Sequence, residues 1–346
     1  MYYIIGGCTM ENNYNHIRLT SAEMGKLWVT YTGNTMAKCV LRYYLQHIDD
    51  KDIKKVVKNA LNLSEKLVNK IKDIFIQENF PIPIGFTDQD VNLGAPRLFS
   101  DEFYLHYLKY TSKAGMSIYS IAIPIMTRED IRDFFIKMFN SAVNLLNEVN
   151  KILIAKGYYE KSPQIPTPDK VDFIKKQKYL NGFFGDIRSL HALEISHLHD
   201  NIENNVTSKC LLIGFSQVSQ TEKVKKFFLR GKELTNKHIE ASTQQLHKDN
   251  LPSLPLLDDL VSTSTYTPFS DKLMLWHKID MFSMKIRSYA NAISLNGRRD
   301  LGAMYVRFLK DIGLYVEDGT NIMIKNGWME QPPEAVDRKE LAMNKE

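Results

Sequence analysis

The sequence predicts an all-α protein made of two tandem four-helix bundles that are related by internal duplication. The motif Phe-Ser-Asp occurs at residues 99–101 and again at 269–271, an offset of 170 residues, each time just before an apolar stretch. Residues 19–41 align without a gap on residues 190–212, with leucine, glutamate, asparagine, lysine and cysteine at matching positions. Three further matches follow in the same order: residues 78–83 with 249–255, 127–131 with 297–301, and 156–163 with 326–333.

Each copy contains segments with the periodicity of an amphipathic helix. In the second copy, the first helix carries core-facing residues three, four or seven positions apart, namely His191, Ile195, Leu198, Ile202, Val206 and Ile213. The other three helices are expected at 222–247, from Phe-Ser-Asp to residue 295, and at 298–327. The segments 81–98 and 252–268 lack a helical period, and connections of this length can run along a whole bundle.

The third helix of each copy begins with the residue types of an N-terminal cap. A serine hydroxyl at this position accepts a backbone N–H group, and the helix dipole favours an aspartate in the first turn. The capping residues expected on this basis are Ser100 with Asp101, Ser270 with Asp271, and, in another helix, Thr127 with Asp130. The recurring motif therefore indicates a helix start and not a catalytic group.

These patterns divide the chain into five parts. They are an N-terminal extension (1–15), a first four-helix bundle (16–160), a linker (161–187), a second four-helix bundle (188–333) and a C-terminal tail (334–346). The front of the linker is rich in proline and is expected to be extended. Its aromatic back half is expected to pack against the bundles, which would make it a docked linker. Either Met1 or Met10 serves as the true start.

The composition excludes several classes of protein. The net charge is +5 and the basic residues are scattered, whereas a nucleic-acid surface needs a concentrated basic stripe. No stretch reaches the roughly 18 to 20 apolar residues that a membrane span requires. The three cysteines, Cys8, Cys39 and Cys210, fit neither a disulfide framework nor a metal motif. We therefore expect a reducing compartment, most simply the cytoplasm.

Several motifs together resemble a known family, catalogued as domain of unknown function 3231. The motifs that carry this resemblance span residues 16–341 and include LTSAEMGKLW, GFTDQDVN, RLFSD, TREDI, KGYY, GDIRSLHALEI, PFSDKLM, RRDL and GWMEQPP. The resemblance implies a ferritin-like four-helix bundle in each copy. It also implies an origin in endospore-forming bacteria, where members often occur as a tandem pair and have been labelled spore coat proteins. It implies no particular activity.

Ferritin-like bundles hold metals through carboxylates and histidines on facing helices, with Glu-x-x-His on two of them. The second copy has Glu194 and His197 at this spacing, although the helical wheel places His197 at the edge of the apolar stripe. The candidate ligands are Glu194 and His238, completed by His191 or His277 according to helix order. Such a site would be a mononuclear zinc or iron centre.

An alternative interpretation is that these histidines are hydrogen-bonded core or edge residues and that Glu194 is one of their partners. The first copy has Lys26, Leu67 and Tyr107 where the second has His197, His238 and His277, so any metal site belongs to the second copy. The inward carboxylate expected on the fourth helix is missing, because Glu317 points outward. The sequence thus favours hydrogen bonding over metal binding.

No motif of a hydrolase, kinase, P-loop or dinucleotide-binding enzyme occurs in the sequence. We therefore expect a non-enzymatic structural or interaction protein, cytoplasmic or spore-associated, that binds a protein partner or a second copy of itself. We expect it to bind no cofactor and no nucleic acid and to contain no membrane span. The alternative is a ferritin-like metal-binding protein with a zinc or iron site in the second bundle.

Overall fold

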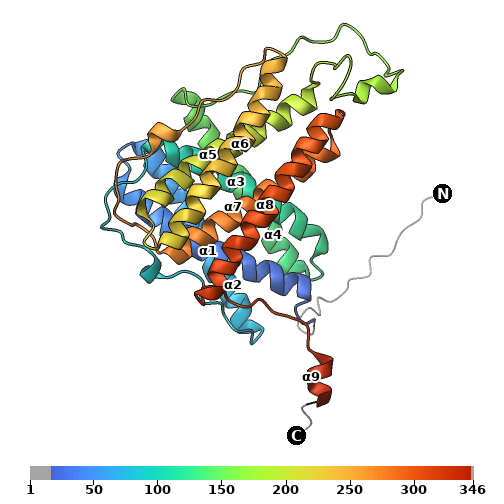
Figure 1. Ribbon diagram of the computed structural model, residues 1–346. Helices are drawn as coiled ribbons and strands as arrows, with labels where there is room; N and C mark the ends of the chain where they lie inside the picture. Colours follow the sequence, from blue (N-terminus) through green and yellow to red (C-terminus); the bar gives the residue numbers. More distant parts are fainter. Residues whose placement is uncertain (1–16, 344–346) are drawn as a thin grey trace, which may run out of the picture.

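The computed structural model describes residues 17–343, so the expected extension 1–15 and Cys8 lie outside the described residues. The first repeat contains α1 (Ser21–His47), α2 (Lys51–Gln77), α3 (Asp101–Ala122) and α4 (Glu129–Ala155) (Figure 1). The second repeat contains α5 (Ala192–Val218), α6 (Glu222–Lys248), α7 (Asp271–Ser294) and α8 (Arg299–Lys325), and α9 (Arg338–Met343) follows in the tail. Residues 17–343 form no β-strand beyond two isolated bridges. The predicted all-α fold with two tandem repeats is confirmed.

Each repeat is built from two helical hairpins. In the first repeat α1 packs mainly on α2 and α3 on α4, and the second repeat uses the same pairs. The helix α3 starts beside the α1–α2 turn, because Oδ2 of Asp101 accepts the backbone N–H groups of Asp49 (3.1 Å) and Asp50 (2.8 Å). The end of α2 lies at the opposite end of the bundle, about 40 Å along a helix of this length. The connection 78–100 therefore runs the length of the bundle.

A buried glutamate fastens the other end of each repeat. Oε1 of Glu23 accepts the backbone N–H groups of Thr127 (3.0 Å) and Arg128 (2.7 Å), which lie in the turn before α4. Its second oxygen completes a capping box with Thr20 at the start of α1. The equivalent Glu194 makes the corresponding bonds to the turn before α8. Charge-assisted bonds of this kind are about twice as strong as neutral ones, so each glutamate ties its first helix to its fourth.

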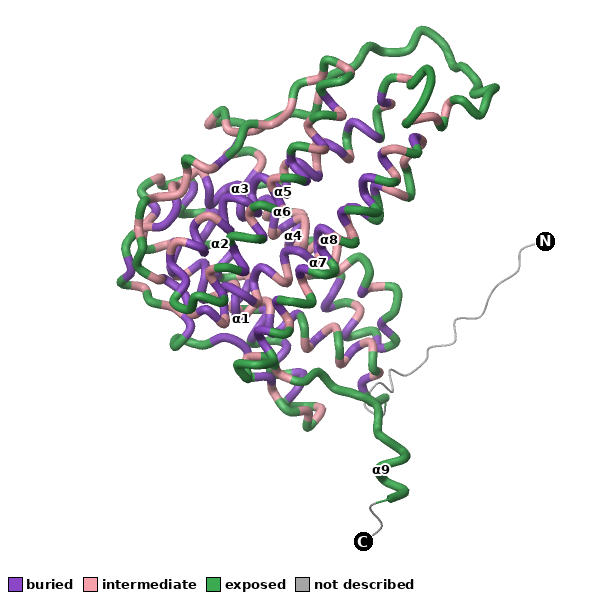
Figure 2. The backbone as a smooth tube through the Cα atoms, in the orientation of Figure 1, coloured by how far each residue is buried: buried purple, intermediate pink, exposed green. Residues whose placement is uncertain are grey.

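The two repeats pack face to face through their long connections and through α3, α5 and α7. The connections pair in antiparallel fashion at Val91 with Phe269 and at Phe99 with Val261. Beside them, Oη of Tyr107 lies 2.7 Å from Nε2 of His277. Because these two residues occupy equivalent positions in the two copies, their contact marks an approximate two-fold axis between the repeats. The core shared by both repeats is continuous across this interface (Figure 2).

The structure differs from the expected helix caps at two places. Ser270 caps α7, and its hydroxyl accepts the N–H of Leu273 at 3.0 Å and donates to Oδ1 of Asp90 at 2.7 Å. Ser100 holds the same position before α3, but its hydroxyl makes no capping hydrogen bond. The helix α4 starts one residue later than expected, with Arg128 as N-cap, because Glu23 already binds the backbone N–H of Thr127.

The aspartates expected in the first turns lie there but bind groups outside their own helices. Asp271 accepts the backbone N–H groups of Gln220 (3.0 Å) and Thr221 (2.9 Å). In the first repeat Asp101 binds the equivalent turn between α1 and α2 in the same way. The carboxylate of Asp130 receives two hydrogen bonds from the guanidinium of Arg128. The first-turn aspartates of α3 and α7 thus link these helices to the neighbouring hairpins.

The linker between the repeats is more exposed than the sequence predicts (Figure 2). Phe173 and Phe184 keep 80% and 86% of their surface exposed, although the aromatic half of the linker was expected to pack. Tyr179 is in contact with Arg188, whose guanidinium lies 4.0 Å from the ring centre.

None of the helices between residues 17 and 343 combines the length and apolar character needed to cross a membrane.

The difference between the two serines gives a matched test of the caps. Ser270→Ala removes both hydrogen bonds of the hydroxyl and should lower the free energy of unfolding by about 1 kcal/mol. Ser100→Ala removes a hydroxyl without a partner and should change the same free energy by less than about 0.5 kcal/mol. Urea titration followed by circular dichroism measures both. Equal losses in the two variants would contradict the assigned difference.

Candidate functional site

Two of the four candidate metal ligands, His191 and Glu194, lie together at one end of the second bundle. The carboxylate of Glu194 is buried and accepts two hydrogen bonds of 2.8 Å from Arg188. It also accepts backbone N–H groups of His191, Gly297 and Arg298. Burial by itself would raise the pKa of Glu194, but these hydrogen bonds hold the pKa below its usual value. The carboxylate is therefore occupied by protein donors.

His238 lies elsewhere, inside the second bundle. Its Nδ1 is 3.1 Å from the hydroxyl of Tyr289, and its ring stacks on Phe308 with 3.9 Å between centroids. Its Nε2 is 3.6 Å from Oδ2 of Asp311, which is half-exposed. Burial, together with the nearby Lys285, lowers the pKa of His238 to about 3. The imidazole is therefore neutral at physiological pH and part of a hydrogen-bonded cluster.

His277 lies at the interface between the repeats, between Tyr107 of the first and Phe215 of the second. Its Nε2 contacts Tyr107 on the approximate two-fold axis, and burial lowers its pKa to about 3. The four candidate ligands thus lie at three separate locations. His191 and Glu194 are in contact, with Nε2 and Oε1 3.4 Å apart, while His238 and His277 each lie elsewhere. Across residues 17–343 no group of three or more His, Cys, Asp or Glu side chains is arranged to hold a metal ion.

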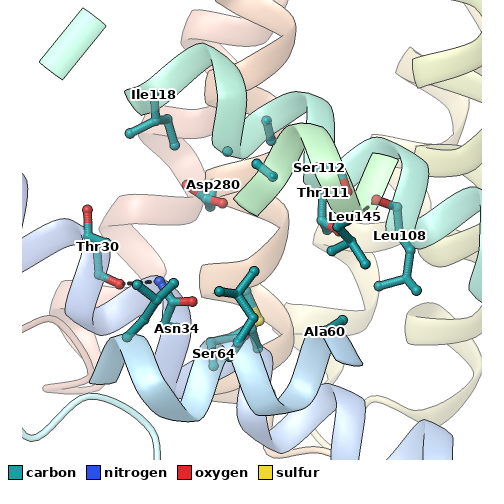
Figure 3. A pocket seen from close by; sticks show the side chains of 18 of the residues that line it. Thr30, Asn34, Ala60, Ser64, Leu108, Thr111, Ser112, Ile118, Leu145 and Asp280 are labelled. Carbon is teal, nitrogen blue, oxygen red and sulfur yellow. Dashed lines mark hydrogen bonds between the residues drawn. The ribbon is translucent and has the colours of Figure 1, made fainter. Parts of the chain in front are cut away.

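A different feature of the structure has the geometry of a binding site. The helices of the first bundle, together with α7, line a cavity of about 170 Å³ (Figure 3). Most of its wall is apolar and includes Met36, Leu63, Leu67, Leu108, Met138 and Leu145. Its polar groups include Thr30 and Asn34 from α1, Ser64 from α2, Thr111 and Ser112 from α3, and Asp280 from α7, beside three tyrosines of α3 and His277.

The cavity carries one carboxylate, and this comes from the other repeat. Asp280 lies on α7 and points into the space between α1, α2 and α3 (Figure 3). Burial raises the pKa of Asp280 to about 6, and the positive charge of Arg287 opposes this increase. The guanidinium of Arg287 is itself bound to Ser117 and Ser283. In the described part of the chain, no cation forms an ion pair with Asp280 within 4 Å.

Three tyrosines of α3 surround Asp280. Burial raises the pKa of Tyr107, Tyr110 and Tyr119, and the charge of Asp280 raises each of them further. The hydroxyl of Tyr110 donates to the carbonyl oxygen of Met281, and that of Tyr107 is bound to His277. The hydroxyls of Tyr107 and Tyr110 therefore bind other groups, and neither donates a hydrogen bond to the carboxylate of Asp280.

Side-chain size explains why the first bundle is hollow. The first repeat has Gly115, Ser112, Ala142 and Met138 at positions where the second repeat has Lys285, Phe282, Ile312 and Phe308. In the second bundle the amine of Lys285 lies 4.2 Å from the ring centre of Phe282 and donates to Thr235 at 3.2 Å. Burial lowers the pKa of this amine well below its usual value. The same arrangement of four helices is therefore filled by larger side chains in the second repeat and leaves a cavity in the first.

The sequence analysis did not single out Asp280, Lys278 or Lys285. The available signal was the charged residues of a helix that is otherwise rich in apolar side chains: six of them lie between residues 271 and 294, three of which are Lys278, Asp280 and Lys285. Lys278 is fully buried, and its amine donates to the hydroxyl of Ser208 at 2.7 Å. Buried charges are rare unless they are paired, so an unpaired charge in such a helix indicates a cavity or a function.

The metal hypothesis can be tested at His238. In His238→Leu the new side chain matches Leu67 of the first repeat, and Tyr289 keeps its hydrogen bond from Asn205 (2.8 Å). We expect the free energy of unfolding to change by less than about 1.5 kcal/mol. We also expect substoichiometric zinc and iron in both proteins, measured by mass spectrometry after purification without a histidine tag. One metal ion per wild-type chain that is lost in the variant would support the metal site instead.

The raised pKa of Asp280 predicts a pH-dependent stability. The pKa moves from 3.8 to about 6 on folding, so ionisation destabilises the folded state increasingly between about pH 4 and pH 6, and fully above that range. Asp280→Asn removes the charge and should raise the free energy of unfolding at pH 7.5 by about 1 to 3 kcal/mol. Urea titrations at several pH values should show this gain shrinking as the pH falls toward 4. A gain that is independent of pH, or one shared by the exposed Asp133→Asn, would contradict the assignment.

Comparison with known proteins places the chain in a family. No curated protein matches the sequence. Among solved structures, a crystal structure of a protein from Bacillus halodurans C-125, provisionally named a spore coat protein, is similar at 20% identity and a TM-score of 0.38. That likeness covers 46% of this chain and 100% of the other. Residues 9–171 and 178–341 each match the family described as "Protein of unknown function (DUF3231)", so the chain belongs to this family and carries two copies of its domain.

Proposed function

We propose that this protein is a non-enzymatic structural or interaction protein that associates with the spore by binding another protein. The observation that carries the proposal is an exposed apolar segment between the repeats. This linker patch consists of Val171, Phe173, Ile174, Phe183 and Phe184, each more than half exposed. Clustered exposed apolar side chains are uncommon on isolated proteins and mark interaction surfaces.

The charge around the linker patch indicates the kind of partner. Between residues 169 and 186, four lysines (Lys170, Lys175, Lys176 and Lys178) accompany the apolar side chains, against three aspartates (Asp169, Asp172 and Asp186). An apolar patch with a positive rim is complementary to an apolar surface with acidic groups around it. The prolines that precede the patch favour an extended chain, which costs less conformational entropy to fix on a partner than a flexible one.

Family membership supports the link to sporulation, because members of this family occur in endospore-forming bacteria. The connection 78–100, which runs the length of its bundle, supports the finer proposal that each repeat has ferritin-like connectivity. No contact among residues 17–343 favours a zinc or iron site at Glu194 and His238. Metal binding therefore remains a prediction that the His238→Leu measurement decides.

Localisation during sporulation tests this proposal. A fluorescent fusion of the full chain, expressed in a spore-forming bacterium, should collect on the developing spore. Replacing Phe173 and Phe184 together by serine should leave the fusion diffuse, because the partner loses its main apolar contacts. Circular dichroism should show that this variant is folded, since both side chains are exposed.

A matched control replaces another exposed apolar residue. Ile324 on α8 is 59% exposed and lies outside the linker patch. Ile324→Ser should localise like the wild-type protein. A wild-type fusion that stays diffuse throughout sporulation would overturn the proposed function, and normal localisation of the double variant would exclude the linker patch as the contact.

A further inference from the structure

We propose that the cavity of the first bundle binds a small organic amine, with its ammonium group at Asp280 and its apolar body among the helices. This inference rests on the geometry of the cavity and is independent of the proposed spore association. The ligand class follows from three observations: the size of the cavity, its single unpaired carboxylate, and the side chains that fill the same place in the second bundle.

The size and walls of the cavity set the size of the ligand. A cavity of about 150 Å³ lined by apolar side chains accommodates a benzene ring, and this cavity measures about 170 Å³. Leucine and methionine side chains of α1 to α4 make up much of its wall. A ring or a short branched chain therefore fits, with room for one polar group. The rim includes Val29, which is 39% exposed, so the cavity reaches the surface beside α1.

The polar groups of the cavity select a cation. Asp280 is the single carboxylate of the lining, and its charge has no ion-pair partner in the described chain. The hydroxyl groups of Thr30 and Ser112 also line the cavity and have no hydrogen-bond partner. An ammonium group needs one negative charge and two further oxygen acceptors. A divalent metal ion would need more carboxylate or carbonyl ligands than one carboxylate among apolar side chains provides.

At the equivalent place in the second bundle, the space between the helices holds the amine of a lysine side chain. Lys285 occupies the position of Gly115, and its amine donates to Thr235, the residue equivalent to Ser64 in the cavity wall. Phe282 occupies the position of Ser112, so an aromatic ring and an alkylamine fill the space that is open in the first bundle. A free aromatic amine would supply the same two chemical groups to the first bundle. There the carboxylate of Asp280 would pair with the ammonium group, whereas the amine of Lys285 has no carboxylate partner among residues 17–343.

Calorimetric titration of the full chain with benzylamine at pH 7.5 tests the proposal. One benzylamine per chain should bind to the wild-type protein. Asp280→Asn should weaken the affinity by about tenfold or more, the usual contribution of a hydrogen bond to a charged group. The variant is expected to be more stable than the wild type at this pH, so loss of binding would not reflect unfolding. Benzyl alcohol, which has the same shape without the charge, should bind more weakly than benzylamine.

Two further variants separate the cavity from the protein surface. Ala142→Ile places in the cavity the side chain that the second repeat has at Ile312, and should abolish benzylamine binding by filling the space. Asp133→Asn removes an exposed carboxylate of α4 and should leave the affinity unchanged. No heat of binding from benzylamine at millimolar concentration would overturn the proposal. Equal binding by the wild type, Asp280→Asn and Ala142→Ile would also overturn it.

Discussion

Helix α7 is packed on both of its sides, and the arrangement of the two repeats depends on it. One side meets its own bundle and carries Lys278, Phe282 and Lys285, and the other meets the first repeat and carries His277, Asp280 and Met281. Lys278 and Lys285 are buried and Asp280 is half-buried, so their charged groups have lost much of their contact with bulk water. Each charge must then bind a partner inside the protein or face a cavity. The two lysines bind hydroxyl groups, and Asp280 faces the cavity.

Carboxylates at the two ends of each bundle hold α7 and its counterpart α3 in place. Asp271 and Asp101 bind the turns of the neighbouring hairpins, while Glu194 and Glu23 bind the turns that precede the fourth helices. All four accept backbone N–H groups, which are present whatever the local side chains are. Because each repeat makes the same four hydrogen bonds between its two carboxylates and backbone N–H groups, the third helix begins at the same level along the bundle in both repeats. Equivalent residues such as Tyr107 and His277 can therefore meet on the axis between the repeats.

The sequence was sufficient to predict the helices and the duplication, because periodicity and turn residues are local signals. One interpretation of the sequence made Glu194 a hydrogen-bonding partner of the nearby histidines, and in the structure Glu194 and His191 form a capping box. The cavity could not be predicted, because periodicity indicates one core-facing side of a helix, whereas α7 packs on both bundles. Asp280 faces the other bundle, and its surroundings depend on how the repeats dock. The exposed linker was missed for a similar reason, since its aromatic residues pack only if a bundle leaves them an apolar surface.

The two repeats share a frame but differ in what fills it. A hollow between helices forfeits packing contacts, and an unpaired, half-buried carboxylate beside it adds to that loss. The second repeat shows that Lys285, Phe282 and Ile312 fit the same frame, so the hollow is not forced by the fold. The first bundle therefore combines two destabilising features in one place. A ligand that fills the space and pairs the charge offsets both, because a molecule that binds the folded state alone stabilises it by mass action.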